Sequence, residues 1–412
     1  MLNEELIDKV VERLVRRVEK GNEYVLEEIG ATIRKFGEMT PSQARQLAQI
    51  LKYGGNYDKI TKRLAEITEL NVKDIYKMFE EVAKNDYRFA KQFYKYRNIK
   101  YIPFEQNGAL QRQIKALAEI TAKEYINISQ TRAFARMVNG KIKYTSLADT
   151  YQEVIDEAIL NVGQGKQNFD TAMRKTIKEL GDSGIRSVDY ESGRSVRMDS
   201  AIRMNLKGGL THMHEEMQKQ IGEEFDADGK EISVHFNPAP DHQEAQGKQF
   251  SINQYDKDGN LIKQGEYEKL QETGYAKSYD GQDIDMHLEL ANGESALSHR
   301  PIGEYNCYHY TFSIVLGVSK PNYSNKELKD IIKQNEKGFE YDGKHYTNYE
   351  GTQLQRKIET EIRKTKDTLA IAKSSDIEEE IISSKKKLKM LNQKYQELSK
   401  VSGLKPKYER LR

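Results

Sequence analysis

The residues best suited to chemistry gather in the second half of the sequence. All eight histidines lie between positions 212 and 345, and the single cysteine, Cys307, falls within the same stretch. Imidazole and thiol side chains supply general acids and bases, nucleophiles and metal ligands. Any centre built on histidine or cysteine is therefore expected in this part of the chain.

The tightest grouping of these residue types consists of His235, His242, Cys307 and His309. Cys307 and His309 are two residues apart, so their side chains lie on the same side of an extended chain. His242 follows in a loop after the strand expected to carry His235. Sulfur and imidazole nitrogen together suit tetrahedral zinc, although no CxxC pair or familiar zinc-finger spacing is present. The group is a candidate zinc site, and no other cofactor is indicated.

Two other interpretations of this grouping stay open. In the structural one, Cys307 is a small buried hydrophobe and the histidines bond to the backbone or to Asp241. In the catalytic one, His242 and His309 act with Asp241 and Lys248 in a metal-independent nuclease, or Cys307 is a nucleophile with histidine as its base. The sequence holds no P-loop, GxGxxG, GxSxG or HExxH motif, so the chain is expected not to be an enzyme.

The elements that must position these residues form a compact mixed α+β domain with a short antiparallel sheet, over residues 221–325. Residues 231–236 alternate apolar and polar side chains, as a half-buried strand does. Residues 247–252 and 310–318 are two further strand candidates. Turn-rich loops separate these segments.

Helices are expected on both sides of that domain, which makes the fold class α+β. Residues 1–220 are expected to be mainly helical and to dock on other subunits, with long helical patterns over 107–139 and 145–180. On a helix starting near Ser195, Arg197 and Arg203 are expected on an exposed basic face with local ion pairs. A phosphate or partner contact is the other interpretation of these arginines. Residues 326–412 are expected to form a charged helical hairpin or coiled coil.

Charge is distributed unevenly along a polar chain. Of 412 residues, 32% are charged, and the net charge is only +2. Residues 221–300 hold 17 acidic and 7 basic side chains, a net of −10, whereas residues 351–412 hold 9 and 16, a net of +7. The basic tail could meet nucleic acid or an acidic protein, although a solvated helical face is the simpler explanation. No apolar run approaches the roughly 20 residues of a membrane span.

Several short segments also resemble, in order, those of a known family. They are 188–194, 222–224, 228–235, 240–242, 246–251, 306–309, 346–350 and 402–406. This order is similar to that of the phage minor capsid protein 2 family and, more distantly, to that of the Mu F-like head morphogenesis proteins. The family pattern usually has Asn-Cys-Arg-His where this chain has Asn306-Cys307-Tyr308-His309, so a contact made by that arginine would be made differently here.

The resemblance implies a low-copy structural protein of a tailed-phage head, made in the host cytoplasm and located in the virion. It implies the portal protein and major capsid or scaffold proteins as partners, during head assembly, DNA packaging or ejection. Packaged DNA is a further candidate partner for the basic C-terminal helices. The alternative function is that of a nuclease or toxin-like effector carried in the phage head.

Overall fold

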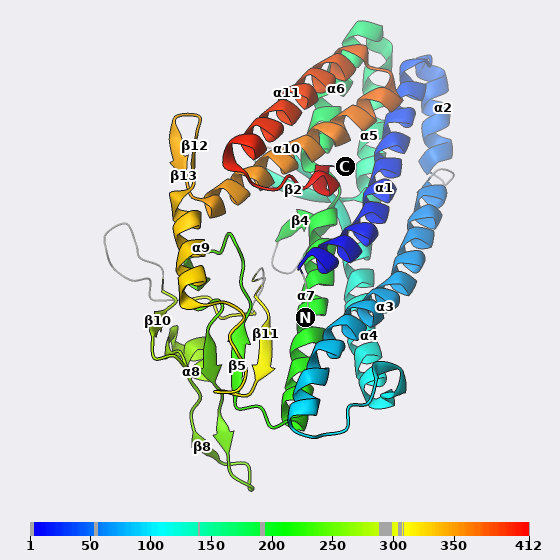
Figure 1. Ribbon diagram of the computed structural model, residues 1–412. Coiled ribbons are helices and arrows are strands. Elements are labelled where there is room, and N and C mark those ends of the chain that lie inside the picture. The colour runs from blue at the N-terminus through cyan, green and yellow to red at the C-terminus, as the bar shows by residue number, and fades with distance from the viewer. Residues whose placement is uncertain are drawn as a thin grey trace. The chain divides into compact units, whose positions relative to one another are not determined.

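The computed structural model describes residues 4–52, 57–138, 141–189, 194–287, 299–303, 307 and 309–411 (Figure 1). Within these residues long helices dominate and the sheets are short and antiparallel, which confirms the α+β class. No described helix is long and apolar enough to cross a membrane.

The helices are α1 (Glu4–Gly37), α2 (Pro41–Lys52), α3 (Tyr57–Tyr96), α4 (Gly108–Gln130), α5 (Leu147–Asn161), α6 (Lys166–Ser183), α7 (Met198–Glu224), α8 (Glu266–Thr273), α9 (Asn325–Lys337), α10 (Asn348–Ser375) and α11 (Glu378–Ser402). Short 3-10 helices are η1 (Phe104–Gln106), η2 (Val162–Gln164), η3 (Pro240–His242) and η4 (Tyr408–Leu411). The strands are β1 (Arg132–Val138), β2 (Lys141–Ser146), β3 (Arg186–Val188), β4 (Ser195–Arg197), β5 (Gly229–Ile232), β6 (Gln249–Ser251), β7 (Gln254–Tyr255), β8 (Leu261–Lys263), β9 (Tyr275–Lys277), β10 (Asp283–Asp285), β11 (Thr311–Ile314), β12 (Phe339–Tyr341) and β13 (Lys344–Tyr346).

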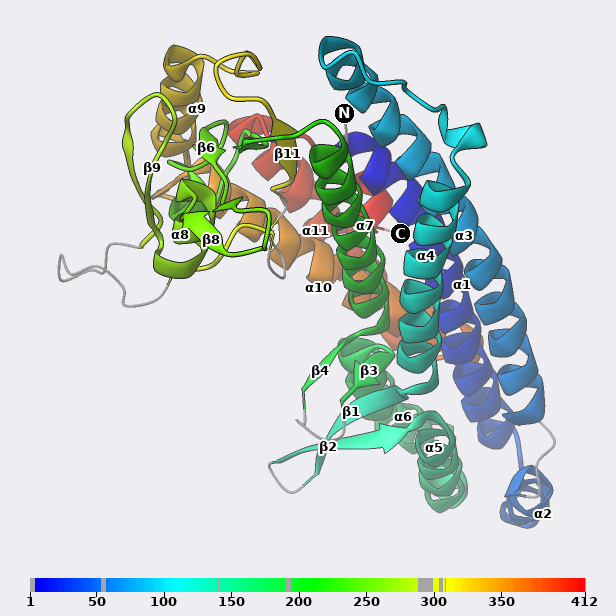
Figure 2. The ribbon, with the colours of Figure 1, turned by 90° about the horizontal axis from the view of Figure 1, so that it is seen from below.

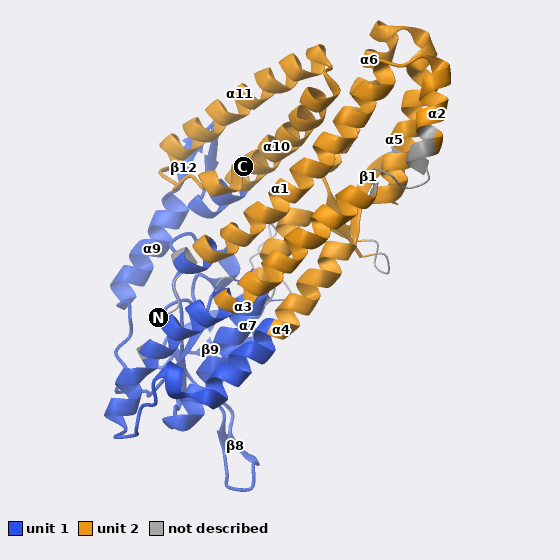
Figure 3. Cartoon of the chain, turned by 90° about the vertical axis from the view of Figure 1, so that its right-hand side faces the viewer, with its two compact units in different colours: residues 1–8, 78–118, 207–353 blue, residues 9–77, 119–206, 354–412 orange. Residues whose placement is uncertain are grey.

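Contacts within the chain define two compact units, each assembled from three stretches of sequence (Figure 3). Unit 1 comprises residues 1–8, 78–118 and 207–353, and unit 2 comprises residues 9–77, 119–206 and 354–412. Each unit therefore depends on pairing segments that lie far apart in the sequence.

Unit 2 contains a four-stranded antiparallel sheet with the strand order β2-β1-β3-β4. β1 pairs with β2 from Ala133 opposite Ser146 to Val138 opposite Lys141. Helices α5 and α6 pack against β1 (Figure 2). Ser146 also begins α5, because its hydroxyl accepts a hydrogen bond from the backbone N–H of Asp149.

The helical pattern expected over residues 107–139 is wrong after Gln130, where α4 ends and β1 follows. The start of the pattern expected over 145–180 is also shifted, since β2 runs to Ser146. The signal lies in the sequence itself: Asn-Gly at positions 139–140, which fall outside the described residues, precedes a run in which Ile142, Tyr144 and Thr145 favour a strand. That dipeptide is a strong hairpin signal.

The C-terminal helices form an antiparallel hairpin, as the sequence predicts. Tyr395 on α11 donates a hydrogen bond to Glu359 on α10 at 2.9 Å, and Gln355 on α10 donates to Ser399 on α11 at 3.3 Å. Glu359 pairs with Tyr395 and Gln355 with Ser399, so the two helices run in opposite directions. Asp376, with a φ of 58°, lies at the turn between the two helices.

Unit 1 contains the three-stranded antiparallel sheet β11-β5-β6, in which Thr311 pairs with Ile232 and Glu231 pairs with Gln249. Its core brings apolar side chains from the strands together with α8 and the following loops; the buried members are Ile232, Ala245, Phe250, Tyr267, Leu270, Ala276, Ile284, Met286 and Ile302. Burial of these side chains supplies the main driving force for folding of this region.

Two of the three predicted strands are confirmed in shortened form as β6 and β11, but the third stops early. β5 ends at Ile232, so His235 and Phe236 are not part of the strand predicted over 231–236. The backbone N–H of His235 is bound instead by the side-chain oxygen of Gln246 at 2.9 Å. The side-chain oxygen of Gln246 thus takes the place of a backbone carbonyl of a neighbouring strand, and the chain leaves the sheet here.

Candidate functional site

The four residues of the candidate zinc site lie in unit 1, in segments that leave or approach the three-stranded sheet. His235 follows β5, His242 is the last residue of η3, and Cys307 and His309 precede β11. His242, Cys307 and His309 are buried, with exposed fractions of 0%, 7% and 3%, and His235 is half-buried. The fold thus brings together two segments that are about 65 positions apart in the sequence.

Three of these side chains converge on one point. Cys307 Sγ lies 3.5 Å from His242 Nδ1 and 3.5 Å from His309 Nδ1. The ligand atoms of the three residues all lie within 4.8 Å of one another. In the described part of the chain no other His, Cys, Asp or Glu side chains form such a group of three.

The outer nitrogens of the two imidazoles face hydrogen-bond acceptors. His242 Nε2 donates to the carbonyl oxygen of Arg300 at 2.6 Å. His309 Nε2 faces the side-chain oxygen of Gln246 at 3.5 Å, and the backbone N–H of His235 fixes that oxygen in place. Acceptors at Nε2 favour the tautomer with the proton on Nε2, which leaves the Nδ1 lone pair directed at the sulfur.

His235 lies beside this group of three rather than within it. Its ring meets the His309 ring at a centroid distance of 4.6 Å, with the planes 81° apart. The His242 and His309 rings are 5.3 Å apart. The structure therefore places His235 next to the convergent atoms, on the side of His309.

The other two residues of the catalytic interpretation have partners of their own. Arg300 donates to both carboxylate oxygens of Asp241, each at 3.1 Å. Lys248 donates to the side-chain oxygen of Gln282 at 2.8 Å and also contacts Asp280 and Asn325. The Lys248 ammonium is thus bound to these side chains, and no contact joins it to His242 or His309 in the described residues.

Burial sets the protonation of the group. It lowers the pKa of His309 well below its ordinary value, and the neighbouring His235 and His242 add to that effect. Burial likewise lowers the pKa of His242, although Asp241 opposes the shift, and it raises the pKa of the Cys307 thiol. The group is thus a neutral one, with two unprotonated Nδ1 atoms and a thiol.

A comparison with protein families decides what kind of protein carries this group. The family model described as phage minor capsid protein 2 matches residues 2–399. The chain belongs to the phage minor capsid protein 2 family. Comparisons with curated proteins and with solved structures give no match. The match confirms the family resemblance of the sequence and indicates a protein of the phage virion.

In this minor capsid protein, several segments that carry the family resemblance meet around the histidine and cysteine group. The segment 240–242 contains His242, the segment 246–251 contains Gln246, and the segment 306–309 contains Cys307 and His309. Residues 190–193, 304–306 and 308 lie outside the described residues, and these include Tyr308, where the family pattern usually has arginine.

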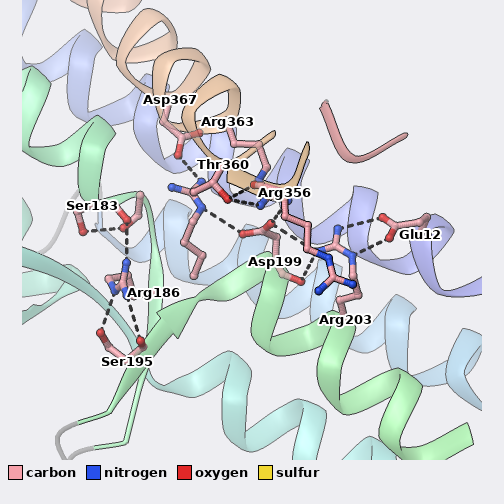
Figure 4. A network of polar contacts seen from close by, with 12 residues as sticks. Glu12, Ser183, Arg186, Ser195, Asp199, Arg203, Arg356, Thr360, Arg363 and Asp367 are labelled. Carbon is pink, nitrogen blue, oxygen red and sulfur yellow. Dashed lines mark hydrogen bonds and ion pairs between the residues drawn. The ribbon is translucent and has the colours of Figure 1, made fainter. Parts of the chain in front are cut away.

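Unit 2 holds a second buried polar group that sequence reasoning missed (Figure 4). The carboxylate of Asp199 on α7 lies 3.1 Å from Arg363 of α10, 3.4 Å from Arg197 of β4 and 3.7 Å from Arg203 of α7. Arg203 in turn binds both carboxylate oxygens of Glu12 on α1, at 2.6 and 3.0 Å. We call these residues, with Asp367, the Asp199 network.

The exposure expected for Arg197 and Arg203 is therefore wrong, although the ion pairs expected with it are present. The helix expected from near Ser195 begins only at Met198, so Arg197 lies on β4. Arg203 is only 9% exposed, and Arg197 also binds Asp367 at 2.7 Å. The spacing of Asp199 and Arg203, four positions apart on α7, indicates a local ion pair. The partners from α1 and α10 could not be inferred, because helical periodicity does not identify which distant charge meets a buried one.

Glu19 on α1 lies close to the carboxylates of this network. Burial raises the pKa of Glu19 to about 8, and the nearby Asp199 adds to the shift. By contrast, the three arginines overcome burial and lower the pKa of Asp199 to about 2. Near neutral pH the network therefore holds Asp199 ionised and Glu19 mostly protonated.

Proposed function

We propose that this minor capsid protein acts with the portal protein of a tailed-phage head during assembly, DNA packaging or ejection, with major capsid or scaffold proteins as further partners. The observation that carries the proposal is the family match over residues 2–399, which includes residues of both units. The head role then belongs to the whole chain rather than to one appended domain.

An exposed hairpin in unit 1 supports a contact with another head protein. β7 and β8 pair Tyr255 with Leu261, and these two side chains and that of Ile262 are 58%, 52% and 67% exposed. Three large apolar side chains close together on a small hairpin are typical of a surface that a protein partner covers. Leu261→Ser combined with Ile262→Ser should weaken that contact without changing the core of unit 1.

The test is crosslinking mass spectrometry on purified heads and procapsids. We expect the protein in both particles, with crosslinks to the portal, and fewer crosslinks from the hairpin variant. Ile382→Ser, which replaces a 58% exposed apolar side chain on α11, is the matched control and should leave the crosslinks unchanged. Absence of the protein from purified heads and from procapsids would contradict the proposal.

The exposed lysines of α11 favour a second contact, with packaged DNA. Lys385, Lys386 and Lys389 are exposed close together on this helix, within a region of net charge +7. Lysine contacts with phosphates release counterions, so DNA binding should fall steeply as salt rises. Replacing the three lysines with glutamine should reduce that salt dependence, and binding that is unchanged by these substitutions would contradict the contact.

A further inference from the structure

We propose that His242, Cys307 and His309 bind one zinc ion in unit 1 through Nδ1, Sγ and Nδ1, with His235 as the fourth ligand. This inference does not depend on the proposed role at the portal. It rests on four features of the described residues: the distances between the ligand atoms, the direction of their lone pairs, the outer hydrogen bonds of the imidazoles, and the enclosure of the group.

The distances already match the edges of a zinc tetrahedron. With Zn–S about 2.3 Å and Zn–N about 2.0 Å, a tetrahedral ion holds its sulfur and nitrogen ligands about 3.5 Å apart. Cys307 Sγ lies 3.5 Å from both Nδ1 atoms. The two nitrogens would lie about 3.3 Å apart around the ion, which is within the 4.8 Å that bounds the whole group.

The lone pairs of the group cannot be satisfied by the thiol alone. A thiol has one proton and can donate to only one acceptor, whereas the Nδ1 atoms of His242 and His309 both face Cys307 Sγ. One nitrogen then meets a sulfur lone pair with no proton between them. A cation at the centre, bound by the thiolate, satisfies all three atoms at once and releases the thiol proton to solvent.

The outer hydrogen bonds follow the pattern of metal-binding histidines. Such a histidine usually donates its second ring N–H to a carbonyl or carboxylate, which fixes the tautomer and orients the metal-binding nitrogen. Here the carbonyl of Arg300 accepts from His242, and the side-chain oxygen of Gln246 faces the outer nitrogen of His309. Gln246 is itself oriented by the backbone of His235, so one amide links two of the four proposed ligands.

The site is enclosed and has a candidate for its fourth position. All three convergent residues are buried, and the core of unit 1 includes Ala245, three positions after His242, and Ile302, five positions before Cys307. The His235 ring packs against that of His309, with centroids 4.6 Å apart, and we assign it to the fourth position after a change of its side-chain rotamer. Four protein ligands would make this a closed, structural site, which joins the segment after β5 to the segment before β11.

The first experiment measures metal content in the full-length protein, purified after expression with zinc in the medium. We expect about one zinc per chain by elemental analysis, as a closed site requires. Cys307→Ser should lose the metal, whereas His212→Ala, which removes an exposed histidine with a 59% exposed side chain, should keep it. Circular dichroism of each variant checks that the helices remain folded.

The second experiment uses the unmodified chain and so does not depend on a variant folding. Cobalt added to metal-free protein should give intense visible bands of tetrahedral coordination and a thiolate charge-transfer band, and zinc should abolish both. We expect Gln246→Ala to weaken zinc binding about 10- to 100-fold, and His235→Ala to weaken it and change the cobalt spectrum.

Three outcomes would contradict parts of this proposal. Chains that hold no zinc and give only the spectrum of octahedral cobalt would overturn the proposal, as would copper or iron in place of zinc. Full zinc content in Cys307→Ser would overturn the thiolate ligand. An unchanged cobalt spectrum and affinity in His235→Ala would overturn the assignment of the fourth ligand.

Discussion

The Asp199 network of unit 2 and the histidine and cysteine group of unit 1 both bury ionisable side chains, but they differ in how the buried groups are balanced. Around Asp199, three guanidinium groups meet three carboxylates, those of Asp199, Asp367 and Glu12, so the charges compensate one another within the chain. Around Cys307, the side chains are neutral and two lone pairs point at one sulfur. Unit 2 thus balances these buried charges with its own residues, whereas the arrangement in unit 1 fits the cation proposed above.

The largest effect is expected from removing the central carboxylate of unit 2. Asp199→Ala leaves Arg197, Arg203 and Arg363 without their shared counter-charge in a buried position. Breaking a buried ion pair in this way typically costs about 3–5 kcal/mol. Urea unfolding measures the loss, and Glu38→Ala at an exposed pair with Arg34 is the control that should change little. A loss for Asp199→Ala no larger than that of the control would show that the network balances without Asp199.

Metal removal tests the histidine and cysteine group of unit 1. If zinc completes unit 1, a chelator should lower the free energy of unfolding of the unmodified protein by about 3 kcal/mol when free zinc exceeds its dissociation constant about 100-fold. The chelator should leave Cys307→Ser unaffected, because that variant has no site to empty. Equal unfolding curves of the unmodified protein with and without chelator would remove the contrast between the two units.

The loop that carries Gln246 gives an intermediate effect. Gly247 has a φ of +68°, and a Cβ there would lie 2.5 Å from Leu328 Cδ2. We expect Gly247→Ala to cost about 2–3 kcal/mol, because backbone strain and steric overlap add. Gly259 is the matched control: its φ is +83° but no atom lies within 4 Å of its Cβ position, so Gly259→Ala should cost only about 1–2 kcal/mol. Thermal unfolding compares the two, and equal losses would mean that Leu328 moves aside.

The smallest effect at any single step is a pH dependence in unit 2, taken per pH unit. The pKa of Glu19 is about 8 in the folded protein against about 4.5 in the unfolded chain, so the folded state holds the extra proton between these values. Stability should therefore fall as pH rises through this window, by at most about 1.4 kcal/mol per pH unit.

Glu19→Gln should flatten that pH dependence, which urea unfolding at pH 6, 7 and 8 can measure. His214 in unit 1 contributes in the same direction: burial opposes its ionisation, but Asp86 outweighs burial and raises the pKa of His214. The difference between the unmodified protein and Glu19→Gln isolates the contribution of Glu19. If the two slopes are equal, Glu19 is already ionised in the folded state.

Local patterns in the sequence predicted the elements whose structure depends mainly on local spacing. The apolar steps of three and four residues over 354–398 predicted the α10–α11 hairpin, and alternation predicted β6 and β11. The β1–β2 hairpin was missed because the helical periodicity before it was extended past Gln130. The three-part division at residues 220 and 325 stays a prediction, while contacts within the chain assemble each unit from interleaved stretches.

The candidate site was foreseen by residue type but not by geometry. The spacing of two positions from Cys307 to His309, and a loop position for His242, are enough to group these side chains. The shared direction of the two Nδ1 atoms depends on Arg300 and Gln246, whose roles follow from tertiary contacts alone. The partners of Asp199 could not be predicted for the same reason, since Glu12 and Arg363 are separated from it by more than 150 positions.

The wide separation of these partners has a consequence for the timing of folding. Synthesis proceeds from the N-terminus, so α1 and α7 leave the ribosome well before α10. Until Arg363 has emerged, the carboxylate of Asp199 lacks one of its three cations, and unit 2 has no complete set of charges to bury. The newly made chain therefore cannot bury the full set of charges around Asp199 until α10 has been synthesised.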